Sequence, residues 1–156
     1  MYLVRGRNAA TAATADHAIW QVWNPHATQR LKVIQWSMFA QSEAPAAGWS
    51  GRLRRTSARG TAGSTVTPTL EHHSTRGVAP PSGFLLDLAA FTTQPTLVAG
   101  EIGLGFTFSA VQGSGLVYPI PGGLEVPPGT GLTFIQVPAT ASVQFEVSVV
   151  VLEDWL

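Results

Sequence analysis

The sequence predicts an all-β fold, an antiparallel, jelly-roll-like β-sandwich of eight or nine short strands. Near the end of the chain, apolar and polar residues alternate, and the apolar positions are Val143, Phe145, Val147, Val149 and Val151. Proline, glycine and asparagine recur at short intervals, as is typical of proteins with many short strands. No segment carries the apolar stripe of a long helix, so crossover helices and a parallel sheet are not expected.

The length and composition indicate one domain. A compact fold of 156 residues buries roughly 70% of the surface of its unfolded chain, enough for a core without disulfides or metals. We expect an extended N-terminal arm over residues 1–14 and a single sandwich domain over residues 15–156. Cysteine is absent, which excludes thiolate nucleophiles and zinc–thiolate sites. No apolar run approaches the roughly 18 residues of a membrane-spanning helix, so no membrane partner is expected.

The strands are expected where alternation occurs between turn signals. They are residues 18–23, 31–39, 49–57, 65–70, 84–88, 96–98 and 103–108, followed by two strands after residue 124. The strand at residues 31–39 has apolar groups on both faces, which indicates that both faces are covered. Residues 9–15 are small and form part of the arm or a first edge strand. The proline-rich residues 119–123 are expected to be a connection.

Charge is divided unevenly along the chain. Residues 1–77 contain nine basic and three acidic residues, whereas residues 78–156 contain six acidic residues and no Lys or Arg. Eight of the nine cations are arginine, which suits bidentate pairing with carboxylates. Charged residues make up 12% of the chain, about half of the usual share, so much of the surface is expected to be uncharged contact area. The two halves are expected to pair their charges either within one chain or between neighbouring subunits.

No catalytic, metal-binding or cofactor-binding residue is assigned. The adjacent His72 and His73 would face opposite sides of a regular strand, so they could not bind one ion from it. The glycine spacing over residues 100–105 does not match a dinucleotide fingerprint, and no phosphate loop occurs. We therefore expect neither enzyme activity nor a cofactor. A hydrolase or metal enzyme would require a pocket that brings His17, His26 or the His72–His73 pair together with Asp16, Glu71 or Asp87.

Arginines clustered in the first half are the candidate protein-interface residues, and they are Arg5, Arg7, Arg52, Arg54, Arg55 and Arg59. Nucleic-acid phosphates are one alternative partner for such a cluster. The zero net charge and the lack of an extended basic field favour carboxylates on a neighbouring protein instead. Trp49 is the candidate exposed aromatic residue, which a carbohydrate-binding module would use as a platform. The tryptophans at 20, 23 and 36 are expected in the core.

The C-terminal part of the chain resembles small virion proteins of tailed bacteriophages. The resemblance rests on VPPGTGL at residues 126–132, TFIQ at 133–136, the small-residue turn at 139–141 and the closing LEDW at 152–155. It covers about the last 33 residues firmly, and the rest agrees in strand pattern and in an N-terminal stretch suited to an arm. The proteins that it resembles are capsid decoration, or cement, proteins with jelly-roll-like sandwiches, which are often trimeric.

The resemblance implies a protein that decorates and stabilises a phage capsid by binding at junctions between major capsid subunits. Its location would be the capsid surface of the virion, after synthesis in the host cytoplasm. Its partners would be the major capsid protein and neighbouring copies of itself in a homotrimer, with contacts from residues 1–14 and 52–59. The alternative is a receptor- or glycan-binding sandwich associated with a phage tail or fibre.

Overall fold

The structure is a computed structural model that describes residues 1–8, 14–41, 49–66, 83–101, 103–108, 111–137 and 143–153. These residues form eleven strands: β1 (Tyr2–Arg7), β2 (Ala18–Trp23), β3 (Leu31–Ala40), β4 (Trp49–Ala58), β5 (Ser64–Val66), β6 (Leu85–Leu88), β7 (Thr96–Leu97), β8 (Leu104–Phe108), β9 (Gly115–Val126), β10 (Gly131–Gln136) and β11 (Phe145–Glu153). Over the same residues there is no helix, and hence no helix long and apolar enough to cross a membrane. The prediction of an all-β fold is confirmed.

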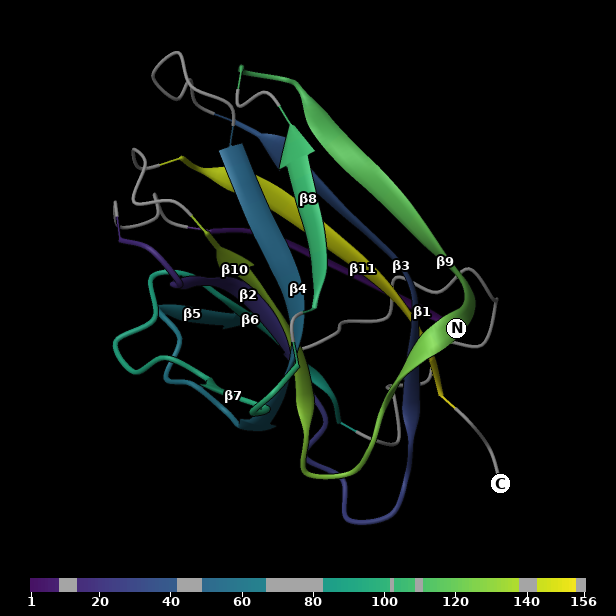
Figure 1. The fold of residues 1–156 in the computed structure, drawn as a ribbon. Coiled ribbons are helices and arrows are strands. Elements are labelled where there is room, and N and C mark those ends of the chain that lie inside the picture. Colours follow the sequence, from purple (N-terminus) through teal and green to yellow (C-terminus); the bar gives the residue numbers. More distant parts are fainter. Residues whose placement is uncertain are drawn as a thin grey trace.

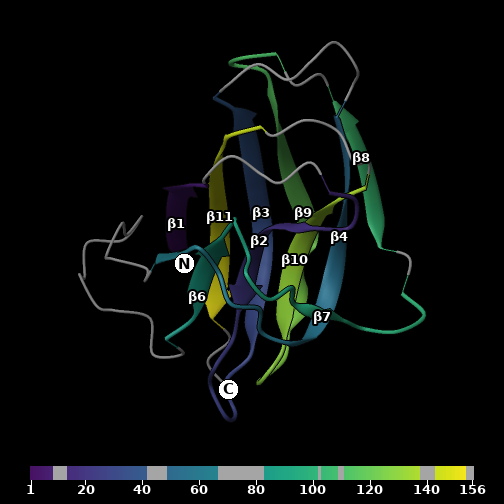
Figure 2. The same cartoon turned by 90° about the vertical axis from the view of Figure 1, so that its left-hand side faces the viewer.

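The strands form two antiparallel sheets that pack face to face (Figure 1). Sheet A has four strands in the order β1-β11-β3-β9. Sheet B has seven, in the order β5-β6-β2-β10-β4-β7, with β8 also pairing with β4. A view turned by 90° shows β11, β3 and β9 running alongside one another (Figure 2). The predicted antiparallel β-sandwich is therefore confirmed.

The pairing of the strands follows a jelly-roll pattern. Three short strands, β5, β6 and β7, lie between β4 and β8 in the sequence. Without them, the remaining eight strands pair first with last (β1–β11), second with seventh (β2–β10), third with sixth (β3–β9) and fourth with fifth (β4–β8). This is a long antiparallel hairpin rolled up so that its strands alternate between two sheets, as in a jelly roll. The β3–β11 and β4–β10 pairs then complete the two sheets.

Two of the eleven strands were not expected, and both lie at the edges of sheet A. Tyr2–Arg7, expected within an extended arm, forms β1 and pairs with β11 along its whole length. Its tyrosine and Val4 are buried, so these residues belong to the sandwich. Residues 119–123, expected as a connection, lie inside β9. Proline is tolerated there because an edge strand leaves one side without ladder hydrogen bonds.

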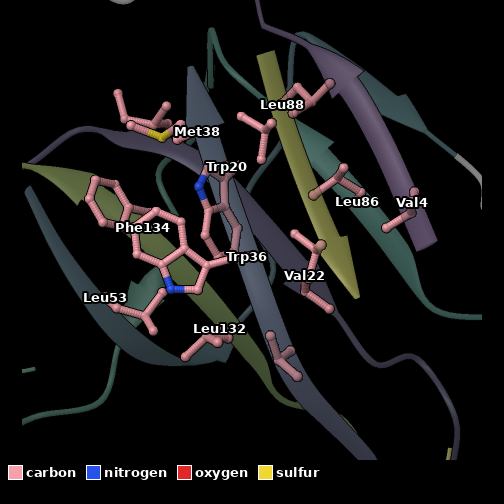
Figure 3. Packing of buried hydrophobic residues seen from close by; sticks show 14 of the residues in the cluster. Val4, Trp20, Val22, Trp36, Met38, Leu53, Leu86, Leu88, Leu132 and Phe134 are labelled. Atoms are coloured by element: carbon pink, nitrogen blue, oxygen red, sulfur yellow. The ribbon is translucent and has the colours of Figure 1, made fainter. Parts of the chain in front are cut away.

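The core lies between the sheets and is built around aromatic rings (Figure 3). Phe134 of β10 stacks on Trp20 at a centroid distance of 6.1 Å and on Trp49 at 5.6 Å, and it meets Trp36 of β3 at 5.0 Å. The alternating residues of the closing strand fill the other end, because Val143, Phe145, Val147, Val149 and Val151 are all fully buried. The sequence prediction that these four valines and one phenylalanine share one buried face is confirmed.

Candidate interaction surface

Ion pairs between described residues join the basic first half of the chain to its acidic second half. They include Arg7–Glu146 (3.9 Å), Arg30–Glu125 (2.6 Å), Arg55–Glu101 (3.7 Å) and Arg59–Asp87 (2.7 Å). At these positions the charge division pairs within one chain, which the sequence left open. The first three pairs have both side chains partly exposed, and such pairs contribute little stability.

The Arg59–Asp87 pair differs from the others because its carboxylate is fully buried. Both Asp87 oxygens accept hydrogen bonds from the guanidinium, with Nε and Nη2 each at 2.7 Å. Thr65 of β5 donates a third hydrogen bond to Asp87 Oδ1 at 2.7 Å. The hydrogen bond to Asp87 raises the pKa of Arg59 above its ordinary value, although partial burial acts in the opposite direction. These three hydrogen bonds satisfy both oxygens of the buried carboxylate.

Asp87 belongs to a row of polar residues that crosses the outer face of sheet B. The register places Thr65, Asp87, Gln21, Thr133 and Arg54 opposite one another on successive strands. Although this row faces away from the core, Asp87, Gln21 and Thr133 are 0% exposed. A second apolar cluster brings Ala18 of β2 and Ile135 of β10 together with Ala89 and Phe91 of the segment after β6, and Ala62 and Leu97 pack against it.

Each buried member of the polar row has a hydrogen-bond partner. Gln21 donates to Thr56 Oγ1 at 2.8 Å and accepts the backbone N–H of Gly60 at 3.1 Å. Thr133 donates to the carbonyl oxygen of Trp20 at 2.7 Å. Because these groups are satisfied by the protein itself, the row fastens the segment after β4 onto sheet B. It is a structural network rather than an open binding site.

The other predicted interface arginines have mixed surroundings. Arg54 donates to the carbonyl oxygen of Val98 at 3.1 Å, and the backbone N–H of Arg55 donates to Glu101 at 2.9 Å. Both contacts hold the turn between β7 and β8. Arg52 is exposed on β4, and none of the described acidic residues forms an ion pair with it. Arg5 is exposed on β1, on the outer face of sheet A. Their role in an interface stays a prediction.

The prediction that Trp49 is an exposed aromatic residue is wrong. Trp49 begins β4 and is 1% exposed. Its ring stacks on Phe134 and meets Phe145 edge to face at 5.0 Å. The register explains this position, because Trp49 lies two and four residues from Gly51 and Leu53, which share its inward face. The aromatic platform that a glycan-binding module was expected to use is thus absent at Trp49.

The described histidines do not gather into a metal site. His26 lies in the turn before β3, where its Nδ1 accepts backbone hydrogen bonds from Thr28 (3.2 Å) and Gln29 (2.9 Å). His17 precedes β2. No group of three His, Cys, Asp or Glu residues able to hold a metal ion occurs in the described part of the chain. The predicted weak strand over residues 65–70, the His72–His73 pair and Glu71 lie wholly or partly outside the described residues.

The outer face of sheet A is the candidate interaction surface. Its outward residues lie in four cross-strand rows: Leu152-Lys32-Glu125, Leu3-Val150-Gln35-Pro119, Arg5-Ser148-Ser37-Val117 and Arg7-Glu146-Phe39-Gly115. Charged side chains stand toward the β1 edge and at the Lys32–Glu125 corner. The middle is apolar or uncharged, and the two serines share a hydrogen bond.

Three large apolar side chains stand exposed on this face, and the sequence did not predict them as contact residues. Val117 is 50% exposed, Phe39 37% and Leu152 36%. Arg5, Gly6, Arg7 and Glu146 line an open depression at the β1 edge. The face thus offers a broad, open surface with charged residues at its β1 edge and at one corner rather than a deep pocket. Val117 was missed because β9 was not recognised as a strand, so its outward alternation carried no weight.

Comparison with known proteins gave no relatives: no family model, no curated protein and no solved structure matches this chain. The fold therefore defines the class, a β-sandwich with jelly-roll pairing. Because one fold serves many functions, a functional conclusion must rest on the surface itself.

Proposed function

We propose that this chain is a structural protein of a virion, which decorates and stabilises a bacteriophage capsid by binding at junctions between major capsid subunits. The observation that carries the proposal is the outer face of sheet A, where Val117, Phe39 and Leu152 are exposed and the charged residues lie toward the β1 edge and at the Lys32–Glu125 corner. A shell protein needs contact area rather than a pocket, and an uncharged face lowers the desolvation cost of binding. The phage-like C-terminal segment, which forms β10 and β11, supports the same role.

In this proposal the partners are the major capsid protein and neighbouring copies of the chain, which the resemblance implies to be arranged as a trimer on the capsid surface. The protein would act without a cofactor or catalytic residue. Many copies on one shell would reinforce contacts that are weak individually. Apolar contact through Val117, Phe39 and Leu152 on the outer face of sheet A would supply affinity, while Arg5 and Arg7 at its β1 edge would steer the protein toward acidic groups.

The N-terminal residues were expected to form a contact arm, but residues 2–7 form β1 and belong to the sandwich. Deleting residues 1–14 would remove Tyr2 and Val4 from the core, so lower occupancy on shells would also follow from unfolding. A substitution on the exposed face separates the two effects. Val117→Lys places a charge on the proposed contact face without removing a core residue.

The test is cosedimentation of the purified protein with phage shells that lack their decoration protein. Val117→Lys is compared with Val98→Lys, which makes the same change at a site 37% exposed beside β7. We expect the wild type and Val98→Lys to cosediment, and Val117→Lys to lose at least about tenfold in affinity, a difference of about 1.4 kcal/mol. Equal binding by the two variants would remove the outer face of sheet A from the mechanism. Failure of the wild type to bind shells would contradict the proposed role.

A further inference from the structure

The two lateral sides of the sandwich differ. On one side, β1 of sheet A packs against β5 and β6 of sheet B, which closes the gap between the sheets. On the other side the sheets end in β8 and β9. There the rings of Phe106 and Tyr118 meet edge to face at 4.8 Å, and Phe106 also contacts Trp36 at 5.0 Å. These rings form the only described aromatic contacts between the two edge strands.

Inward-facing apolar residues remain uncovered on this second side. Leu104 lies opposite Leu53 in the β4–β8 register, yet Leu104 is 47% exposed and Leu53 only 3%. Leu116, Tyr118 and Ile120 of β9 are half-buried in the same way. By contrast, the neighbouring residues of β3 that face the core are fully buried. An apolar strip therefore lies open along β8 and β9.

The edge of β9 is protected against pairing with another strand. Pro119 and Pro121 lack the backbone N–H that a ladder requires. The register with β3 breaks between Val33 and Gln35, opposite the segment that contains Gly122 and Gly123, and both glycines have positive φ. Proline and local irregularity of this kind prevent edge-to-edge association in natural sheets.

The edge of β8 has no such protection. Its sequence, Leu-Gly-Phe-Thr-Phe, contains no proline and no charged residue. One side pairs with β4 over all five residues, and no strand of the described chain pairs with the other side. Alternate backbone N–H and C=O groups of β8 thus point outward, where they form a template for a further strand.

We propose that β8 pairs antiparallel with β8 of a second copy of this chain, across a two-fold axis near Phe106. Among the edges of the described strands, the β8 edge of a second copy is the one suited to pair with β8. β9 is blocked, β1 lies against β5 and β6, and β5 and β7 have only three and two residues. In this register Phe106 faces its own counterpart and Leu104 faces residue 108, so sheet B continues into the partner and Leu104 becomes covered. The strand carries no charge that would repel its own copy.

The contact is small, so association in solution should depend strongly on concentration. A five-residue strand cannot supply the roughly 800 Å² per partner of a standard interface. On a surface that gathers many copies, the same contact would be reinforced by avidity. The inference stands on the edge of β8 and is independent of the proposed capsid role. A trimer would have to use a different surface, because β8 pairing is two-fold.

The test is sedimentation velocity of the full chain over a range of concentrations, with Leu104→Lys compared with Val117→Lys. Both variants replace an aliphatic residue that is about half exposed, at 47% and 50%. We expect the wild type and Val117→Lys to form a dimer reversibly, and Leu104→Lys to dimerise at least about tenfold more weakly because a lysine at an edge strand opposes pairing. Circular dichroism and thermal melting would verify that Leu104→Lys is folded.

Hydrogen exchange of the wild type gives a second readout that needs no variant. Backbone amides of residues 104–108 should gain protection as protein concentration rises, whereas those of β9 should not. A wild type that stays monomeric at all concentrations would overturn the proposal, as would an oligomer that Leu104→Lys leaves unchanged. Because Val117→Lys tests shell binding and Leu104→Lys tests self-association, failure of one proposal is distinguishable from failure of the other.

Discussion

Replacing Arg59 with methionine tests whether its ion pair with the buried Asp87 holds the segment after β4 onto sheet B. Methionine keeps the apolar stem of arginine but removes the guanidinium that donates two hydrogen bonds to Asp87. The Asp87 carboxylate is 0% exposed, so it would lose its counter-ion in a buried place. Thr65 would remain as its hydrogen-bond donor. We therefore expect Arg59→Met to be clearly destabilising.

The magnitude follows from burial. Removing one partner of a fully buried ion pair costs about 3–5 kcal/mol. The Arg59 side chain is 36% exposed, which allows solvent to screen the pair and lowers the expected cost to about 2–3 kcal/mol. For a protein of this size, that change corresponds to a decrease of roughly 4–12 °C in melting temperature.

The assay is urea unfolding, with Arg30→Met as the matched control. Arg30 and Glu125 are as close as the buried pair, at 2.6 Å, but their side chains are 57% and 37% exposed. Arg30→Met should therefore cost about 0–1 kcal/mol. Asp87→Asn combined with Arg59→Met should be less destabilising than the sum of the single variants, because the double variant buries no unpaired charge. If Arg59→Met costs no more than Arg30→Met, or if the double variant is additive, the reasoning is refuted.

Two further predictions concern single residues of the sandwich. Burial, with a contribution from the charge of Glu153, raises the pKa of Tyr2 above its ordinary value of 10.0. The folded state favours the neutral phenol, so its contribution is complete below about pH 10 and is lost as pH rises through the higher folded pKa. Stability measured from pH 8 to 12 should therefore decline less steeply in Tyr2→Phe than in the wild type, and parallel curves would contradict this. Gly51→Ala should destabilise by more than about 2 kcal/mol in urea unfolding, because a Cβ there would meet Phe134 and lie 2.7 Å from the carbonyl oxygen of Ile135. Gly105→Ala has open space around it and should change stability by less than about 0.5 kcal/mol, so equal effects would argue against this packing.

Alternation along the chain identified the interior strands well. β2 has the predicted bounds, and β3 and β4 extend only one residue further than predicted. These strands pair on both sides or have one apolar face in the core. Burial of that face requires apolar residues to alternate along the strand, and this local pattern can be read directly from the sequence. Of the tryptophans expected in the core, Trp20 and Trp36 are buried at 0% exposure, whereas Trp23 at the end of β2 is only partly buried.

The candidate surface was harder to predict than the core. The arginines were identified as contact residues because of their charge, but Arg7, Arg55 and Arg59 form ion pairs within the chain. Trp49 was predicted to be exposed, yet the inward register of β4 buries it. The ion pairs are not encoded in local spacing, since the acidic partners lie 28 to 139 residues away along the chain.

The sequence by itself determined the all-β class, the interior strands and the buried face of β11, because alternation with a period of two is a local property. The tertiary structure decided the rest. The edge strands β1 and β9 become strands through pairing with β11 and β3, which lie far from them in the chain. The same long-range pairing joins the two oppositely charged halves, buries Asp87 and leaves Val117 and the edge of β8 exposed. Pairing between distant segments depends on register and on which edges remain free, and no short stretch of sequence contains that information.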